Sequence, residues 1–165
     1  MVLISMAIGV VAKKFFGSRH RDADEEVQGD HPVVRAIFGA MNTGDFDGVE
    51  GIVDEECQVY ANGHRVESET VDRGPELLVG TMRAFREALP DIRWELYDEV
   101  TEKAHKTEKV AIRFVSHATI DREERQIEVA VFATVEDKKL FEWREVLDAT
   151  VTNLHRAAAG LAPIE

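Results

Sequence analysis

The spacing of apolar residues predicts three helices in the first half of the chain. The first helix begins at His31 and carries apolar side chains every three or four positions: Val33, Val34, Ile37, Phe38 and Met41. Pro32 suits its first turn, and residues 42–44 (NTG) end it. A second, shorter helix has its own apolar stripe: Phe46, Val49, Ile52 and Val53. We expect Thr43 or Asp45 to cap this second helix.

The third helix is predicted to open at Gly74-Pro75 and to end before Pro90. It carries one apolar stripe: Leu78, Met82, Phe85 and Leu89. Between the second and third helices, residues 57–62 predict a short strand that is closed by the turn pair Asn62-Gly63. The polar residues 64–72 that follow indicate an irregular loop or an edge strand.

Four segments of β-type composition fill the second half of the chain: 92–100, 109–119, 126–135 and 140–148. Charged turns separate them, and no helix lies between them. We therefore expect consecutive strands to pair antiparallel, which predicts an α+β fold with a curved, mostly antiparallel sheet packed with three helices.

Alternation along these strands assigns side chains to the two faces of the sheet. In residues 109–119, Val110, Ile112 and Phe114 point one way, whereas Arg113, Val115 and His117 point the other way. Residues 126–135 are apolar on both faces, and a sheet that is apolar on both sides needs two covers. The helices cover one face, so we expect a homodimer in which a second subunit covers the other.

Composition and charge narrow the classes of function. A chain of 165 residues fits one domain. A net charge of −12 argues against a nucleic-acid partner, because a polyanion is repelled by most of the surface. Cys57 is the only cysteine, which excludes an intramolecular disulfide, and it is expected to be a small core residue. The six histidines show no metal-ligand spacing, so neither a metal nor another cofactor is expected.

Residues 1–30 differ from the rest of the chain. Residues 1–12 are almost entirely apolar but too short to cross a bilayer, and a cluster of basic residues follows. Two interpretations stay open: an interfacial anchor on anionic lipid, or a terminal helix that packs on protein. The acidic stretch 22–30 is typical of a linker. The expected organisation is therefore an apolar arm and linker (1–30), a pocket domain (31–149) and a C-terminal helix or tail (150–165). We expect a cytoplasmic protein, which associates peripherally with a membrane if residues 1–12 are an interfacial anchor.

Several local motifs together resemble one known family. They are MNTGDFDGV after the first helix, VYANG at the end of the first strand, RGPELLVGTMRAFREALPDIRWEL across the third helix, and VEDKKLFEWREVLD in the last strand. The tract from His31 to Asp148 thus resembles the SnoaL-like branch of the nuclear-transport-factor-two superfamily. The resemblance implies a cone-shaped α+β barrel, usually dimeric, with a pocket between sheet and helices. The superfamily includes polyketide cyclases, epoxide hydrolases, ketosteroid isomerases and non-catalytic modules, so the fold does not determine the function.

Asp148 is the first candidate for the chemistry that the resemblance implies. It lies where cyclases and epoxide hydrolases of the family carry an acidic residue at the end of the last strand, so it would act as a general acid or base. It also precedes a predicted helix at 149–159, and aspartate is a favoured N-cap residue. Both interpretations stay open and are compatible.

Tyr60 and Asn62 match a Tyr-x-Asn pair with which the epoxide-hydrolase branch holds its attacking water. The alternative is that Tyr60 fills the core and Asn62 makes the turn before Gly63. For Asn62 the turn is favoured, whereas Tyr60 is the stronger candidate for the pocket.

The long strand departs from the epoxide-hydrolase pattern, since Val115 and His117 occupy the positions of its Arg-x-Asp pair. A histidine there resembles the cyclase branch, in which an imidazole holds or protonates an enolate, although a half-buried structural histidine is the plainer alternative. Arg113 would stabilise an oxyanion or pair with a surface carboxylate, and the surface pair is favoured. With Asn62, Val115 and Phe132, it completes the set expected to contact substrate.

Two functions therefore remain. The first is a cofactor-independent acid–base enzyme of the cyclase, isomerase or hydrolase type, acting on a small apolar or polycyclic molecule, with Asp148, His117 and Tyr60 as catalytic residues. The second is a non-catalytic module for ligand binding or dimerisation, tethered to a membrane if the apolar arm is an anchor.

Overall fold

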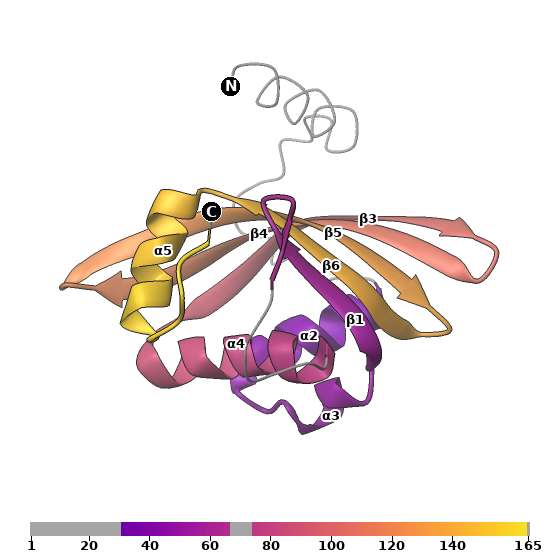
Figure 1. The fold of residues 1–165 in the computed structure, drawn as a ribbon, viewed down its shortest axis with the longest axis horizontal. Helices are drawn as coiled ribbons and strands as arrows, with labels where there is room; N and C mark the ends of the chain where they lie inside the picture. Colours follow the sequence, from indigo (N-terminus) through magenta and orange to yellow (C-terminus); the bar gives the residue numbers. More distant parts are fainter. Residues whose placement is uncertain (1–30, 67–73, 165) are drawn as a thin grey trace, which may run out of the picture.

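The computed structural model describes residues 31–66 and 74–164 of the chain. Four helices and a six-stranded, unclosed sheet form the predicted α+β fold in this part of the protein. The helices α2 (Pro32–Thr43), α3 (Asp47–Glu50) and α4 (Gly74–Ala88) lie together on one side of the curved sheet, and α5 (Ala149–Ala158) lies at one end of it (Figure 1). The expectations for residues 1–30 fall outside the described residues, as does most of the predicted loop after residue 66.

The strands of the sheet run in the order β2-β1-β6-β5-β4-β3. Strands β3 to β6 form the predicted antiparallel meander. The first strand, β1, pairs parallel to β6, a long-range pairing that the sequence did not predict. The strand bounds are β1 (Val53–Ala61), β2 (His64–Arg65), β3 (Arg93–Ala104), β4 (Thr107–Ile120), β5 (Glu123–Glu136) and β6 (Lys139–Leu147).

The ends of the first and third helices follow from local backbone chemistry. Pro32 occupies the first turn of α2, and Gly44 ends this helix in a left-handed conformation with φ +79°. The Asn42 side chain then ties α2 to β3, because its amide and carbonyl each make a 2.9 Å hydrogen bond with the backbone of Trp94. At the start of α4, a Cβ on Gly74 would collide with the carbonyl oxygen of Cys57, so only glycine lets the helix approach β1 this closely.

The short helix α3 differs from its prediction. It spans only Asp47–Glu50, Phe46 is its N-cap residue, and no side chain caps it. The Thr43 hydroxyl instead accepts a hydrogen bond from Asp45 N at 3.3 Å, and the Asp45 carboxylate accepts one from the N–H of Asp47, the first residue of the helix, at 3.4 Å. The apolar residue at 53, which was assigned to the helical stripe, begins β1, since four apolar residues fit either a helix face or the start of a strand.

The alternation predicted for the sheet is present, and it defines two faces. The inner face, which packs against the helices, includes Ile112 and Phe114 of β4 and the fully buried Trp143 of β6. The opposite, outer face includes Arg113 of β4 and Phe132 of β5. Helix α5 packs against β4, β5 and α4, so it lies on the side of the inner face. Among the helices in the described ranges, none is long and apolar enough to cross a membrane.

Candidate functional site

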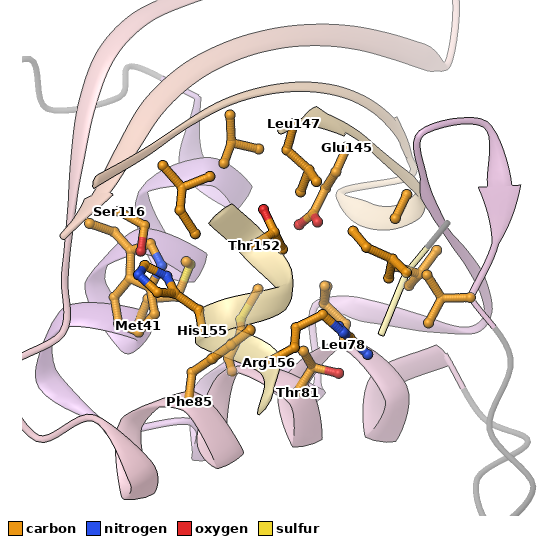
Figure 2. A pocket seen from close by; sticks show the side chains of 18 of the residues that line it. Met41, Leu78, Thr81, Phe85, Ser116, Glu145, Leu147, Thr152, His155 and Arg156 are labelled. Atoms are coloured by element: carbon orange, nitrogen blue, oxygen red, sulfur yellow. The ribbon is translucent and has the colours of Figure 1, made fainter. Parts of the chain in front are cut away.

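A pocket lies between the inner face of the sheet, α4 and α5 (Figure 2). The volume open to the centre of a water molecule is about 90 Å³. Most of the lining is apolar and comes from α4 and the middle of the sheet: Val59, Ala61, Leu77, Leu78, Met82, Phe85, Ile92, Trp94, Phe114, Ile127, Val129 and Leu147. A few polar side chains also line it: Thr81, Ser116, Glu145, Thr152, His155 and Arg156. Such a combination, an apolar cavity with few polar groups, is typical of a small-molecule site.

Glu145 is the acidic residue of this pocket. It lies on β6 two residues after Trp143, so alternation puts both side chains on the inner face. The indole Nε1 of Trp143 donates a hydrogen bond to Glu145 Oε1 at 2.7 Å. Although the residue as a whole is only half-buried, its carboxyl group points into the cavity between sheet and α5 (Figure 2). One oxygen is thus held by a rigid, fully buried partner.

The surroundings of Glu145 raise the pKa of its carboxyl group above the ordinary 4.5, because burial disfavours the charged form. The Trp143 hydrogen bond and the positive charge of Arg156 act in the opposite direction and are weaker. Burial also lowers the pKa of Arg156. A carboxyl group with a raised pKa in an apolar pocket can give and take protons closer to neutral pH than an exposed one can.

Helix α5 supplies two buried polar side chains to the same pocket. Thr152 is 6% exposed and His155 is 1% exposed, and their spacing of three residues puts them on one face of the helix. Neither the Thr152 hydroxyl nor His155 Nε2 has a hydrogen-bond partner in the described part of the protein. Burial lowers the pKa of His155 below its ordinary 6.5, which favours the neutral ring.

Asp148 caps α5 and does not line the pocket. Its carboxylate accepts hydrogen bonds from the backbone N–H groups of Thr150, at 2.8 Å, and Val151, at 3.4 Å. The residue is exposed. The N-cap interpretation of Asp148 is therefore confirmed, and its carboxylate is directed at a helix end rather than at the cavity.

Tyr60 lies on the outer face of the sheet. Its hydroxyl donates a hydrogen bond to Gln58 Oε1 at 2.6 Å, and the guanidinium of Arg144 stacks on its ring at 4.0 Å. Asn62 follows the end of β1 and adopts φ +51°, as the predicted turn requires. Its side-chain oxygen accepts a hydrogen bond from Leu147 N at 3.1 Å, so it joins the turn to β6.

His117 and Arg113 also lie on the outer face, each next to two carboxylates. His117 is buried between two carboxylates, with Nδ1 at 3.2 Å from Glu124 and Nε2 at 3.3 Å from Glu95. The guanidinium of Arg113 lies 2.7 Å from Asp98 and 3.2 Å from Glu128, which confirms the pairing favoured from the sequence.

The predicted site residues are thus not brought together at the pocket. Val115 pairs with Glu128 across the sheet, on the same outer face as Phe132, whose side chain is 36% exposed there. The expected convergence of Asp148, His117 and Tyr60 is absent, and this is the main correction to the sequence analysis. Its physical reason is that the helices cover the more apolar face, to which the residues Ile112 and Phe114 belong.

Three polar pocket residues were not predicted from the sequence, and only one of them had a recognisable sequence pattern. Glu145 carried a signal, because a carboxylate two positions after a buried tryptophan shares its apolar strand face. Thr152 and His155 carried none, since they lie beyond the motifs that were compared. The largest apolar side chain of α5, Leu154, is exposed, so apolar residues do not mark the buried face of this helix.

Two further candidate chemistries concern the thiol of Cys57 and the binding of a metal ion. Cys57 is buried, and burial raises the pKa of its thiol to about 12, so it is a core residue and not a nucleophile. Within residues 31–66 and 74–164, no group of three or more His, Cys, Asp or Glu side chains is placed to hold a metal ion.

Solved structures with this architecture define the class to which the fold belongs. IdmH from Streptomyces antibioticus, a candidate polyketide cyclase, is 15% identical with a TM-score of 0.56, over 78% of this chain and 96% of its own. AclR from Streptomyces galilaeus, a candidate hydroxylase, is 18% identical with a TM-score of 0.57, over 79% and 95%. An LEH-like epoxide hydrolase from M. tuberculosis is 17% identical with a TM-score of 0.54, over 76% and 86%. At these identities the likeness establishes a shared cone-shaped α+β fold.

The sequence itself assigns the family. Residues 34–143 match the model of the SnoaL-like domain, and the chain therefore belongs to the SnoaL-like family, as its motifs indicated. No curated protein matches the chain in sequence.

Proposed function

We propose that the protein binds a small, largely apolar molecule in the inner-face pocket, and that Glu145 exchanges protons with this molecule. The observation that carries the proposal is a carboxyl group buried in an apolar cavity and held by one strong hydrogen bond, from Trp143. A structural carboxylate at the surface of this protein is instead paired, as Glu142 is with Arg144 at 2.7 Å. A buried carboxyl group without an ion-pair partner in direct contact costs stability, so its presence favours a chemical role.

The proposed chemistry is acid–base catalysis. As a carboxylate, Glu145 takes a proton from a carbon next to a carbonyl group, and the electron pair of that C–H bond moves to the carbonyl oxygen as an enolate forms. The protonated Glu145 then returns a proton, either to the same carbon or to another one. Isomerisation and aldol-type cyclisation both begin in this way. The candidate cyclase among the structural neighbours makes this class of reaction plausible for the fold, and the epoxide hydrolase extends it to the addition of water.

The experiment measures proton exchange directly, because no substrate needs to be known. Cyclohexanone is incubated with the protein in D₂O, and deuterium incorporation beside the carbonyl is followed by NMR. We expect acceleration by the wild-type protein and a loss of about 10²- to 10⁴-fold in Glu145→Gln. The matched control is Glu142→Gln, on the same strand but on the outer face, which is expected to retain the rate.

Binding without chemistry is the second candidate, and it would make the protein a ligand-binding module. The observation that favours it is that Asp148, His117 and Tyr60, the groups that resemblance to the enzyme branches singles out, do not converge. If cyclohexanone shifts the NMR signals of pocket residues but exchanges no faster than in buffer, the acid–base role of Glu145 is wrong and this second candidate replaces it.

A further inference from the structure

Two polar atoms on α5 are buried in the pocket without a protein partner. They are the hydroxyl oxygen of Thr152 and Nε2 of His155, one turn apart on the helix face that closes the cavity (Figure 2). Two other buried histidines of the described residues, His31 and His117, each bring one ring nitrogen to a carboxylate, and only their second ring nitrogen lacks a hydrogen-bond partner. His31 Nε2 lies 2.9 Å from Glu108, and His117 Nδ1 lies 3.2 Å from Glu124.

Buried polar atoms without partners are costly to a folded protein. Each has lost its hydrogen bonds to water without replacing them, and native proteins contain few such atoms. An apolar residue at 152 or 155 would avoid this cost, since leucine and phenylalanine already line the same cavity. The two atoms therefore point to a partner that is not part of the chain.

The chemistry of the pair selects the kind of partner. A threonine hydroxyl and a neutral imidazole can both donate hydrogen bonds, and a carbonyl oxygen has two lone pairs to accept them. An anionic group fits less well, because Glu145 shares the pocket, Arg156 already interacts with Glu145, and the protein carries a net charge of −12. A neutral carbonyl group matches both donors.

The size of the cavity limits the rest of the ligand. About 90 Å³ is available, which is less than the roughly 150 Å³ of an engineered cavity that holds one benzene molecule. It is also well below the roughly 300–1,000 Å³ of drug-sized pockets. A single ring with one oxygen substituent therefore requires small movements of the lining side chains, and a fused polycycle requires a much larger rearrangement.

From these observations we propose that Thr152 and His155 form a carbonyl-recognition site, and that the ligand is a compact ketone or aldehyde with about one ring. The inference deepens the proposed function and rests on the pocket assigned there. It also gives the two donors a role in the reaction. Hydrogen bonds to the carbonyl oxygen stabilise the enolate that forms when Glu145 removes a proton from the neighbouring carbon. Thr152 and His155 are then groups that touch the substrate, and α5 is the element that confers specificity.

The test compares two probes of nearly the same shape on the full chain by NMR titration. Cyclohexanone carries the carbonyl oxygen, and methylenecyclohexane replaces this oxygen with a CH₂ group. We expect the wild-type protein to bind the ketone about tenfold more tightly, the difference that about 1.4 kcal/mol of hydrogen bonding produces. The larger ketone 2-decalone, with two fused rings, is expected to bind at least tenfold more weakly than cyclohexanone.

Two threonine variants locate the effect. Thr152→Val is expected to lose about fivefold in affinity for cyclohexanone and nothing for methylenecyclohexane, whereas Thr152→Ser retains the ketone preference. The matched control is Thr81→Val, also in the pocket wall, because the Thr81 hydroxyl already donates to the Leu77 carbonyl oxygen at 2.8 Å and has no free donor to offer. His155→Phe, which keeps a ring of similar shape, is expected to reduce the preference as Thr152→Val does.

Several outcomes would overturn the inference. Equal affinity for the two probes, or equal effects of Thr152→Val and Thr81→Val, would mean that no carbonyl site exists on α5. Tighter binding of 2-decalone would refute the size limit. These outcomes are distinct from failure of the proposed function, because they concern binding and not turnover. A ketone preference that depends on Thr152 in a protein without proton exchange would support this inference and refute the role of Glu145.

Discussion

The two faces of the sheet treat ionisable side chains in opposite ways. On the outer face, Arg113 lies between Asp98 and Glu128, and Arg144 pairs with Glu142. On the inner face, Glu145 has one neutral hydrogen-bond donor. Glu142 and Glu145 are three residues apart on the same strand, yet the arginine hydrogen bond lowers the pKa of Glu142 while burial raises that of Glu145.

This difference shows that the face of the sheet, more than the residue type, decides which carboxylate can do chemistry. A paired carboxylate stays ionised over a wide range of pH and is already committed to its partner. A carboxyl group in an apolar cavity has a pKa nearer neutrality and a free oxygen for a ligand. Tyr60 and His117, the candidates that the resemblance supplied, have suitable chemistry, but they lie on the outer face, where their polar groups contact other side chains of the sheet.

The largest effect is expected when a charge is forced onto each face at adjacent positions. Val131 is fully buried on the inner face, and Phe132 is 36% exposed on the outer face. Val131→Lys buries an unpaired ammonium group and should destabilise the protein by on the order of 5 kcal/mol or prevent folding. Phe132→Lys should change the free energy of unfolding by less than about 1 kcal/mol. Urea denaturation of the two variants measures the contrast.

The homodimer through the outer face of the sheet stays a prediction, and the same pair of variants tests it. If a second copy covers the outer face, Phe132→Lys leaves the subunit folded and lowers the mass measured by sedimentation to that of one chain. Comparable destabilisation by the two lysines in a monomeric protein would contradict the assignment of the faces.

A moderate effect on stability is expected at Asp148, which lies beyond the end of the sheet and caps α5. Asp148→Ala removes the cap from α5 and should lower the free energy of unfolding by about 1 kcal/mol, whereas Asp148→Asn keeps an acceptor oxygen and should be nearly neutral. Proton exchange on cyclohexanone should persist in Asp148→Asn. A loss of exchange comparable to that of Glu145→Gln, in a protein of unchanged stability, would return the acid–base role to Asp148.

The smallest effect is a trend of stability with pH. The pKa of Glu145 is raised in the folded state, so this state binds more protons than the unfolded chain above the ordinary pKa of 4.5. The stability that Glu145 contributes is therefore complete below this pKa and is lost as pH rises through the window up to the folded-state pKa. Glu145→Gln lacks this loss, so its stability should gain on the wild type as pH rises above the ordinary pKa of 4.5.

Glu142→Gln supplies the control with the opposite sign. The pKa of Glu142 is lowered, so the stability that its ionisation contributes is present above its ordinary pKa and is lost as pH falls. The variant should therefore fall behind the wild type as pH rises from below the lowered pKa of Glu142 to above its ordinary 4.5. Parallel curves for the two glutamine variants, measured by denaturation at each pH, would mean that the two carboxylates do not differ as the structure indicates.

Much of the fold was accessible from periodicity, because each prediction needed only local information. The stripe Val33–Met41 gave α2, and alternation in residues 109–119 separated Ile112 from Arg113 correctly. The pairing of β1 with β6 was not accessible, since it joins residues such as Val59 and Trp143 that are far apart in the sequence. No local pattern specifies such a partner.

The candidate site was predicted less well, for a related reason. Alternation tells which residues share a face, but it does not tell which face the pocket occupies. Assigning Val115 and His117 to the pocket required that second fact, and the resemblance to the family supplied it incorrectly. The covered face is set by total apolar burial, to which Phe114 and Trp143 contribute far more than the charged alternates do.

The family match ends at residue 143, before Glu145 and before the whole of α5. Four of the six polar side chains that line the pocket, Glu145, Thr152, His155 and Arg156, thus lie beyond the stretch that assigns the chain to its family. Similarity over residues 34–143 therefore reports the scaffold of the cone and not these four side chains.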